Sequence, residues 1–312
     1  MKKYLSRLFI FLLIPAVIVS VISVAVPATP RSTKSLLFSK LDKDILLENT
    51  PSPRLILIGG SNLTFGIDSS LFKQALGLNP INTAIQASIG LTYMLKNTIE
   101  YVRPGDIVII SPEYSQFYAR YAFGEEELLR TVLDVDRQSL KTLNLNQWLN
   151  ILEYLPRYAI SKIKPSEYNF KENPFIGIYE RKSFNEYGDV NIHWNHESID
   201  FKTKDPIEGK FNDQVIKELL LFENQVLEKD AMLFITFPCL EEHTYQVFEE
   251  NIIQVEEELI KNGFQILGTP PRYRVPKDLS YNTPYHLNRE GAMYRTTLLI
   301  EDLRSAGIPL ED

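Results

Sequence analysis

The stretch Arg54-Leu-Ile-Leu-Ile-Gly-Gly-Ser-Asn62 decides the fold class. Its first five residues form a short, mostly apolar run that stops at two glycines, which is typical of a strand buried on both faces of a parallel sheet. Glycine lets the backbone turn sharply, so we expect Ser61 to be held exposed at the carboxyl end of this strand. Backbone N–H groups at the start of the next element can then face an oxyanion.

The same strand signal recurs along the chain, and helical patterns separate the strands. Further strands are predicted at residues 80–82, 106–110, 232–237 and 264–267, with helices at 88–102, 216–226, 248–259 and 288–305. Alternating strands and helices favour an α/β fold: a doubly wound, mainly parallel, five-stranded sheet of the flavodoxin-like kind. In such sheets ligands bind at the carboxyl ends of the strands.

Three parts are predicted along the 312 residues. Residues 1–30 are expected to be a membrane anchor, 31–50 a juxtamembrane linker or helix, and 51–312 the α/β domain. Within that domain, residues 115–210 are less regular, with long loops expected at 164–210. An insertion of this length suits a lid or a wall of a substrate site.

The N-terminus predicts the compartment. Lys2, Lys3 and Arg7 precede 19 uncharged residues, 8–26, which as a helix would span about 28 Å, close to the thickness of a bilayer core. Basic residues before the apolar run keep the N-terminus cytoplasmic. We expect a single-pass protein of a bacterial cytoplasmic membrane, with its catalytic domain on the extracytoplasmic side. The alternative is a cleaved signal peptide, although no Ala-x-Ala cleavage site follows the run.

Composition excludes several classes of function. The net charge of -7 and the pI of about 5.3 give no basic footprint for nucleic acid or anionic lipid in the charge balance of the whole chain. Cys239 is the single cysteine, so neither an intrachain disulfide nor a cysteine-based zinc site is possible. His193 and His196 have a spacing found in zinc sites, but the asparagines around them indicate a loop, and we predict no metal site.

A second motif stands near the C-terminus, at Tyr281-Asn-Thr-Pro-Tyr-His-Leu-Asn-Arg-Glu-Gly-Ala292. His286 follows the fifth predicted strand and precedes the last helix, so it shares the carboxyl edge of the sheet with Ser61. A histidine there can deprotonate the serine and later protonate a leaving group.

These two blocks resemble the first and last blocks of the SGNH/GDSL hydrolases. The resemblance runs over about residues 52–305, with its strongest motifs at 55–61 and at His286-Leu287-Asn288. It implies a serine–histidine–acid triad acting on acyl esters, without a metal or cofactor. It also extends to the membrane-anchored branch associated with membrane-bound O-acyltransferases, which modify cell-surface polymers.

The chain departs from the family pattern at the acid. Where the family has an aspartate about three residues before the histidine, this chain has Thr283, preceded by Asn282. Asn282 can orient His286 by a hydrogen bond but supplies no charge for the imidazolium. Asp278 is the alternative partner. In a serine protease, changing this aspartate to asparagine lowers turnover about 10⁴-fold.

The oxyanion blocks depart as well. Ala87 replaces a glycine and can still donate its backbone N–H, beside that of Ser61. Glu113 and Tyr114 follow the third strand, where the family usually supplies an asparagine, and a carboxylate cannot donate to an oxyanion unless it is protonated. Asn62 is the candidate for the missing side-chain donor. Glu113, Tyr114 and Asp278 are predicted to support the site.

Two functions remain open from the sequence. The first is a membrane-anchored serine esterase or O-acyltransferase acting on an acylated cell-envelope polysaccharide or a small ester. The second is a catalytically weak or inactive partner of a polytopic O-acyltransferase, which the altered triad favours. A purely structural envelope protein would leave the placement of Ser61 and His286 without a reason.

Overall fold

The computed structural model describes residues 2–169 and 177–308. Its centre is a five-stranded sheet in the order β2-β1-β3-β4-β6, and every pair of neighbours is parallel. The strands are β1 (Arg54–Gly59), β2 (Asn79–Asn82), β3 (Ile107–Ser111), β4 (Met232–Thr236) and β6 (Ile266–Leu267). The predicted α/β class and the five-stranded sheet are confirmed, and the strand order is the doubly wound order 2-1-3-4-5. A separate two-stranded parallel sheet pairs β5 (Leu240–Glu241) with β7 (Arg274–Val275).

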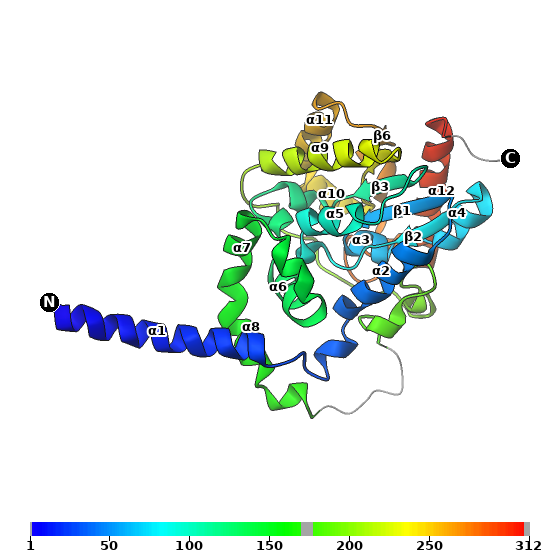
Figure 1. Ribbon diagram of the computed structural model, residues 1–312. Helices are drawn as coiled ribbons and strands as arrows, with labels where there is room; N and C mark the ends of the chain where they lie inside the picture. The colour runs from blue at the N-terminus through cyan, green and yellow to red at the C-terminus, as the bar shows by residue number, and fades with distance from the viewer. Residues whose placement is uncertain (1, 170–176, 309–312) are drawn as a thin grey trace.

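Helices cover both faces of the sheet (Figure 1). The longer helices are α2 (Ser39–Asn49), α4 (Ser69–Leu76), α5 (Leu91–Ile99), α9 (Asp213–Glu228), α11 (Glu249–Lys261) and α12 (Arg289–Ser305). The shorter ones are α3 (Ser61–Thr64), α6 (Glu126–Arg130), α7 (Leu145–Ile151), α8 (Leu155–Lys162) and α10 (Glu242–Val247). Between them lie short turns of 3-10 helix and a π-helical turn, η6 (Thr131–Val135).

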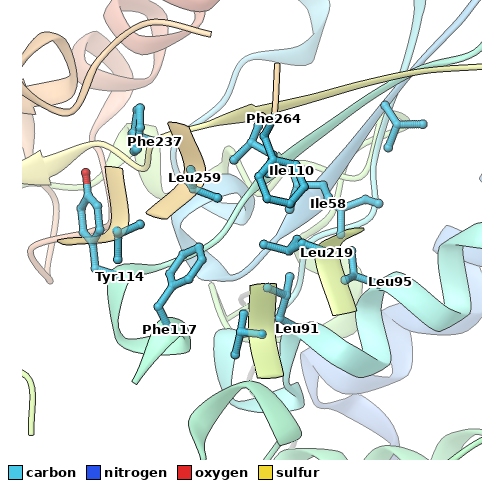
Figure 2. Close-up of a cluster of buried hydrophobic side chains, with 14 of the residues drawn as sticks. Ile58, Leu91, Leu95, Ile110, Tyr114, Phe117, Leu219, Phe237, Leu259 and Phe264 are labelled. Carbon is cyan, nitrogen blue, oxygen red and sulfur yellow. The ribbon is translucent and has the colours of Figure 1, made fainter. Parts of the chain in front are cut away.

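Alternate side chains of each strand feed two hydrophobic layers, as the period of two requires. On one face, Ile58 and Ile110 pack with Leu95 of α5, Leu219 of α9 and Leu259 of α11 (Figure 2). On the other face, β1 and β3 pack against α3, α4 and α12. Burial of both layers fixes the register of the strands, and therefore the positions of the residues that follow them.

A buried ion pair fixes the amino ends of the two central strands. The Arg54 guanidinium at the start of β1 pairs with Asp106, just before β3, and both side chains are fully buried. The guanidinium also donates to the Leu47 carbonyl oxygen of α2 at 2.6 Å. The segment 31–50 is therefore packed onto the α/β domain, with Leu36 and Leu37 buried in a third hydrophobic cluster.

That third cluster belongs to the irregular region predicted at 115–210. It joins Leu128 of α6, Ile151 of α7 and Tyr158 of α8 to the segment around Leu36. Residues 170–176 of the predicted insertion lie outside the described residues. The described part of this region is thus a group of short helices beside the sheet, packed against residues 36 and 37.

Helix α1 (Lys2–Ala25) projects away from the rest of the chain beside α8 (Figure 1). Most of the large apolar side chains described along it are exposed: Tyr4, Ile10, Phe11, Leu13, Ile14, Val17, Ile18, Val21 and Val24. Across residues 2–169 and 177–308, however, no helix is at once long enough and apolar enough to cross a membrane. The predicted membrane-spanning helix is therefore not confirmed.

Candidate active site

Ser61 begins α3 directly after β1 and is half-buried. The preceding Gly60 lies against the loop after β2, because a Cβ built on Gly60 would lie 2.7 Å from Ala87 Cβ and 2.9 Å from Ala87 N. A Cβ on Gly59 would lie 2.7 Å from the Ser111 carbonyl oxygen. Only glycine permits approaches this close. The two glycines therefore hold Ser61 against the ends of both neighbouring strands.

The Ser61 hydroxyl is bound to the carboxylate that follows β3. Its Oγ donates to Glu113 Oε1 at 3.1 Å, and the Asn62 N–H points to the same oxygen at 3.4 Å. Glu113 is 4% exposed. Since Ser61 and Glu113 follow β1 and β3, they lie at the point where the strand order reverses, which is where doubly wound sheets bind ligands.

The loop after β2 is joined to this pair through Gln116, which lies in the 3-10 turn η4 (Tyr114–Phe117). The Glu113 N–H donates to Gln116 Oε1 at 3.1 Å, and Gln116 Nε2 donates to the Ala87 carbonyl oxygen at 3.1 Å. Glu113 thereby couples the position of Ser61 to that of Ala87. Neither the Ser61 N–H nor the Ala87 N–H has a hydrogen-bond acceptor among the described residues. Both remain available to an oxygen atom of a ligand.

Asn62, predicted as a side-chain donor to an oxyanion, lies in a buried network below α3. Its Nδ2 donates to the Ser111 carbonyl oxygen at 3.1 Å, and its Oδ1 accepts from Arg295 Nη2 at 2.9 Å. Arg295 Nη1 also donates to the Asn62 carbonyl oxygen at 2.6 Å. Asn62 and Arg295 are both fully buried. The structure therefore places the Asn62 amide among supports of the Ser61 turn.

His286 lies at the same edge of the sheet, 6% exposed. Its Nδ1 lies 2.8 Å from Asn282 Oδ1, and Asn282 Nδ2 donates to the Tyr179 hydroxyl at 2.7 Å. Because the Asn282 oxygen can only accept, Nδ1 carries the proton and Nε2 carries the free lone pair, the tautomer that a base needs. The His286 N–H donates to Thr283 Oγ1 at 3.1 Å, so Thr283 shapes the loop and Asn282 faces the ring.

The surroundings of His286 disfavour its charged form. Burial is the largest cause, followed by the charges of His193 and Lys204, and together they lower the pKa of His286 to about 3. Within residues 2–169 and 177–308, no carboxylate raises the pKa of His286 against this shift. Asp278, the other predicted partner, lies exposed in the turn η13 (Lys277–Leu279), and its side chain makes no bond to His286.

No hydrogen bond joins Ser61 to His286 in the described part of the chain. The two residues are linked through Phe65, four residues after Ser61. The Phe65 ring stacks on the His286 ring with centroids 4.4 Å apart, and the Leu287 N–H donates to the Phe65 carbonyl oxygen at 3.2 Å. The predicted nucleophile and base thus share one edge of the sheet, with Ser61 held by Glu113 in this conformation.

Tyr114, predicted to support the site, faces the core. It is 1% exposed and packs beside Phe117 and Phe237 (Figure 2). Burial raises the pKa of Tyr114 well above its ordinary value. Its contribution is therefore to hold the η4 turn, and with it Glu113, against the sheet.

Tyr179 and His193 also lie at the site, although the sequence analysis assigned neither of them a part in it. Tyr179 packs edge-on against Phe65 at 5.4 Å and binds Asn282. His193 is fully buried, and its Nε2 lies 2.8 Å from the Leu287 carbonyl oxygen. Burial lowers the pKa of His193 to about 4. Across residues 2–169 and 177–308, no three His, Cys, Asp or Glu side chains are grouped as metal ligands.

A buried lysine supports the loop after β2. Lys43 of α2 donates to the carbonyl oxygens of Asn82 and Gly188, each at 2.7 Å. Asp189 accepts from Asn82 Nδ2 at 2.8 Å and from Ser69 Oγ at 2.7 Å. Burial lowers the pKa of Lys43 to about 7 and raises that of Asp189. The loop that carries Ala87 is therefore fixed from below by this polar network.

An open cleft of about 530 Å³ adjoins the site. It is lined by Gln86, which precedes Ala87, and by Tyr179, which binds Asn282. Its other walls come from residues 31–37 and from the irregular region, including Arg31, Glu127, Arg130 and Lys164. The cleft is thus polar and carries both signs of charge.

Comparison with known proteins gives remote likeness in structure and none in sequence. No protein-family model and no curated protein matches the chain in sequence. The crystal structure of protein YxiM from Bacillus subtilis resembles it with 12% sequence identity and a TM-score of 0.38. The likeness covers 83% of this chain, which spans 58% of the length of YxiM. A likeness this remote carries no argument about activity.

Proposed function

We propose that this protein is a serine esterase or acyltransferase, with Ser61 as its nucleophile and His286 as its base. The observation that carries the proposal is the placement of a half-buried serine, two free backbone N–H groups and a neutral histidine at the strand-order reversal of a doubly wound sheet. These are the parts that acyl transfer needs, in the place where such sheets bind ligands.

In the proposed reaction, the Ser61 hydroxyl exchanges Glu113 for His286 Nε2 as its hydrogen-bond partner. Oγ attacks the acyl carbonyl carbon while its proton passes to Nε2. The carbonyl oxygen, now negative, accepts from the Ser61 and Ala87 N–H groups. His286 then returns the proton to the leaving alcohol, and the acyl group stays on Ser61 until water or a second hydroxyl removes it.

Asn282 and Glu113 are positioning residues in this scheme. Asn282 holds His286 in the tautomer with a free Nε2, and Tyr179 holds Asn282. Glu113 fixes the resting position of the Ser61 hydroxyl and, through Gln116, that of Ala87. No metal or cofactor takes part in the proposed steps.

The proposed substrate is an O-acylated glycan of the cell envelope or a small ester. The adjoining cleft supports a polar substrate, because its lining mixes serine, glutamine, tyrosine and charged side chains. Hydrolysis and transfer share the first step, and the acceptor that reaches Ser61 decides between them.

Fluorophosphonate labelling followed by peptide mass spectrometry tests the proposed nucleophile. We expect one modified residue, Ser61, and loss of labelling in Ser61→Ala. Ser166→Ala is the matched control, because Ser166 is exposed on the wall of the cleft and is expected to leave labelling intact. Labelling that survives Ser61→Ala would contradict the proposal.

A second candidate is a weak or inactive partner of a polytopic O-acyltransferase. It is favoured by the neutral Asn282 beside His286 and by the low pKa that burial gives this histidine, since a weaker base is a poorer proton acceptor. Co-purification with a membrane acyltransferase that Ser61→Ala leaves unchanged, together with no labelling of Ser61, would favour this candidate. Labelling at Ser61 would reject it.

We also propose attachment to the bacterial cytoplasmic membrane through α1, with the α/β domain on the extracytoplasmic side. The exposed apolar side chains along α1 support attachment. Membrane fractions washed with carbonate should retain the full chain, and detergent should release it. Recovery of the chain without detergent would contradict attachment.

A further inference from the structure

A second exposed apolar surface lies on α7, α8 and the turn between them, η8 (Leu152–Tyr154). Leu145, Leu149 and Leu152 recur at intervals of four and three, so they share one side of this helical stretch. They are 72%, 53% and 48% exposed, and Ile160 and Ile163 are 56% and 59% exposed. Single exposed leucines are ordinary. Five large aliphatic side chains within 19 residues form a patch, which we call the α7–α8 face.

The α7–α8 face is the outer side of well-packed helices. Ile151, Tyr158 and Ala159 of the same stretch are buried in the third hydrophobic cluster or beside it. Lys162 is 2% exposed, pairs with Asp134, and its Nζ donates to the Pro27 carbonyl oxygen at 3.0 Å. The inner side is therefore fixed, and about half or more of each large apolar side chain on the outer side is exposed.

This face is adjacent to α1. Helix α8 packs against α1, and Figure 1 shows α1 leaving the molecule beside α8, with α7 along the same side. The exposed apolar side chains of α1 thus start next to those of α8. A lipid surface that receives α1 would meet the α7–α8 face.

The net charge of the sequence around the α7–α8 face is opposite in sign to that of the whole chain. Residues 137–164 hold five basic residues and one acidic residue, a net of +4 in a chain of net -7. Arg137, Lys141, Arg157 and Lys164 are exposed, although Arg157 also pairs with Glu126 at 3.1 Å; the fifth, Lys162, is buried against Asp134 and adds no charge to the surface. Basic side chains around an apolar stripe complement an anionic lipid surface. Protein–protein interfaces, in contrast, are depleted in lysine.

We propose that the α7–α8 face rests on an anionic membrane, with its leucine and isoleucine side chains at the boundary between headgroups and acyl chains. The contact adds to the proposed attachment through α1 and does not depend on the chemistry at Ser61. It would hold the domain in one orientation, with the side that carries α7 and α8 against the lipid.

A fluorescent label tests the contact in the full chain. Leu149→Cys is labelled with an environment-sensitive fluorophore; Cys239 is fully buried and stays unlabelled. Leu221→Cys, at a 54% exposed leucine of α9, is the matched control. Vesicles contain phosphatidylcholine alone or mixed with phosphatidylglycerol. Both variants are checked by circular dichroism and by co-sedimentation with the vesicles.

We expect the label at position 149 to shift to the blue, and to be quenched by brominated acyl chains, in the anionic vesicles only. The label at position 221 should not respond. Arg157→Gln and Lys164→Gln should each lower, about fivefold, the ratio of protein with the α7–α8 face on the lipid to protein with this face in water. Unshifted labels on co-sedimenting protein would overturn the proposal while leaving attachment through α1 intact. Equal shifts at both positions, or a concentration-dependent shift in detergent without lipid, would also overturn it.

Discussion

Acid should destabilise the folded chain through two buried histidines, His286 and His193. Burial lowers their pKa values to about 3 and about 4, whereas both titrate near 6.5 when unfolded. The unfolded chain therefore binds more protons below pH 6.5, so stability falls as the pH falls from 6.5 toward 4 and 3. At pH 5 each histidine costs about 2 kcal/mol, and the pair costs about 4 kcal/mol relative to pH 8.

Urea unfolding followed by tryptophan fluorescence measures this cost. The wild-type chain and a His193→Asn, His286→Asn variant are compared at pH 8 and pH 5 in the same detergent. Asparagine does not titrate, so the variant should lose about 4 kcal/mol less than the wild type between the two pH values. Both proteins contain the same carboxylates, so subtracting one loss of stability from the other cancels the contribution of these groups. Equal losses of stability would refute the assigned burial of the two histidines.

Three substitutions test the supports of the site. Gly60→Ala would push its Cβ against Ala87 and, by displacing one oxyanion donor, should lower ester hydrolysis about 100-fold, measured as kcat at unchanged circular dichroism. Arg295→Met leaves buried neutral oxygen atoms without their donor and should lower the free energy of unfolding by about 1–3 kcal/mol, measured in urea; a loss below about 1 kcal/mol would contradict the network. Asn282→Asp supplies the charge that His286 lacks and should raise turnover at least about tenfold, up to the 10⁴-fold known for such a pair; lower turnover at pH 7 would contradict the assigned role.

Strong periodicity made the sheet predictable from the sequence. Short apolar runs that end at glycine or a polar residue predicted all five parallel strands, because a strand buried on both faces has no polar alternation. The chain order of the strands then placed Ser61 and His286 at one edge. The position of α1 followed from its uninterrupted apolar run, although spanning a membrane was not confirmed.

The contacts between side chains of the site were harder to predict from the sequence. Tyr179 reaches Asn282 across 103 residues, and no local pattern reports such a contact. Arg295 did leave a signal, because it lies on the buried stripe of α12 with Ala292 and Leu299, where an arginine needs a specific partner. The Glu113 bond to Ser61 depended on the turn after β3, which spacing alone does not fix.

The most direct test of the central claim is burst hydrolysis of p-nitrophenyl acetate by the full chain, beside Ser61→Ala, His286→Ala and the control Ser166→Ala. We predict a burst of one nitrophenolate per chain in the wild type and in Ser166→Ala, and no burst in the other two variants. A burst of wild-type size in Ser61→Ala would contradict the account.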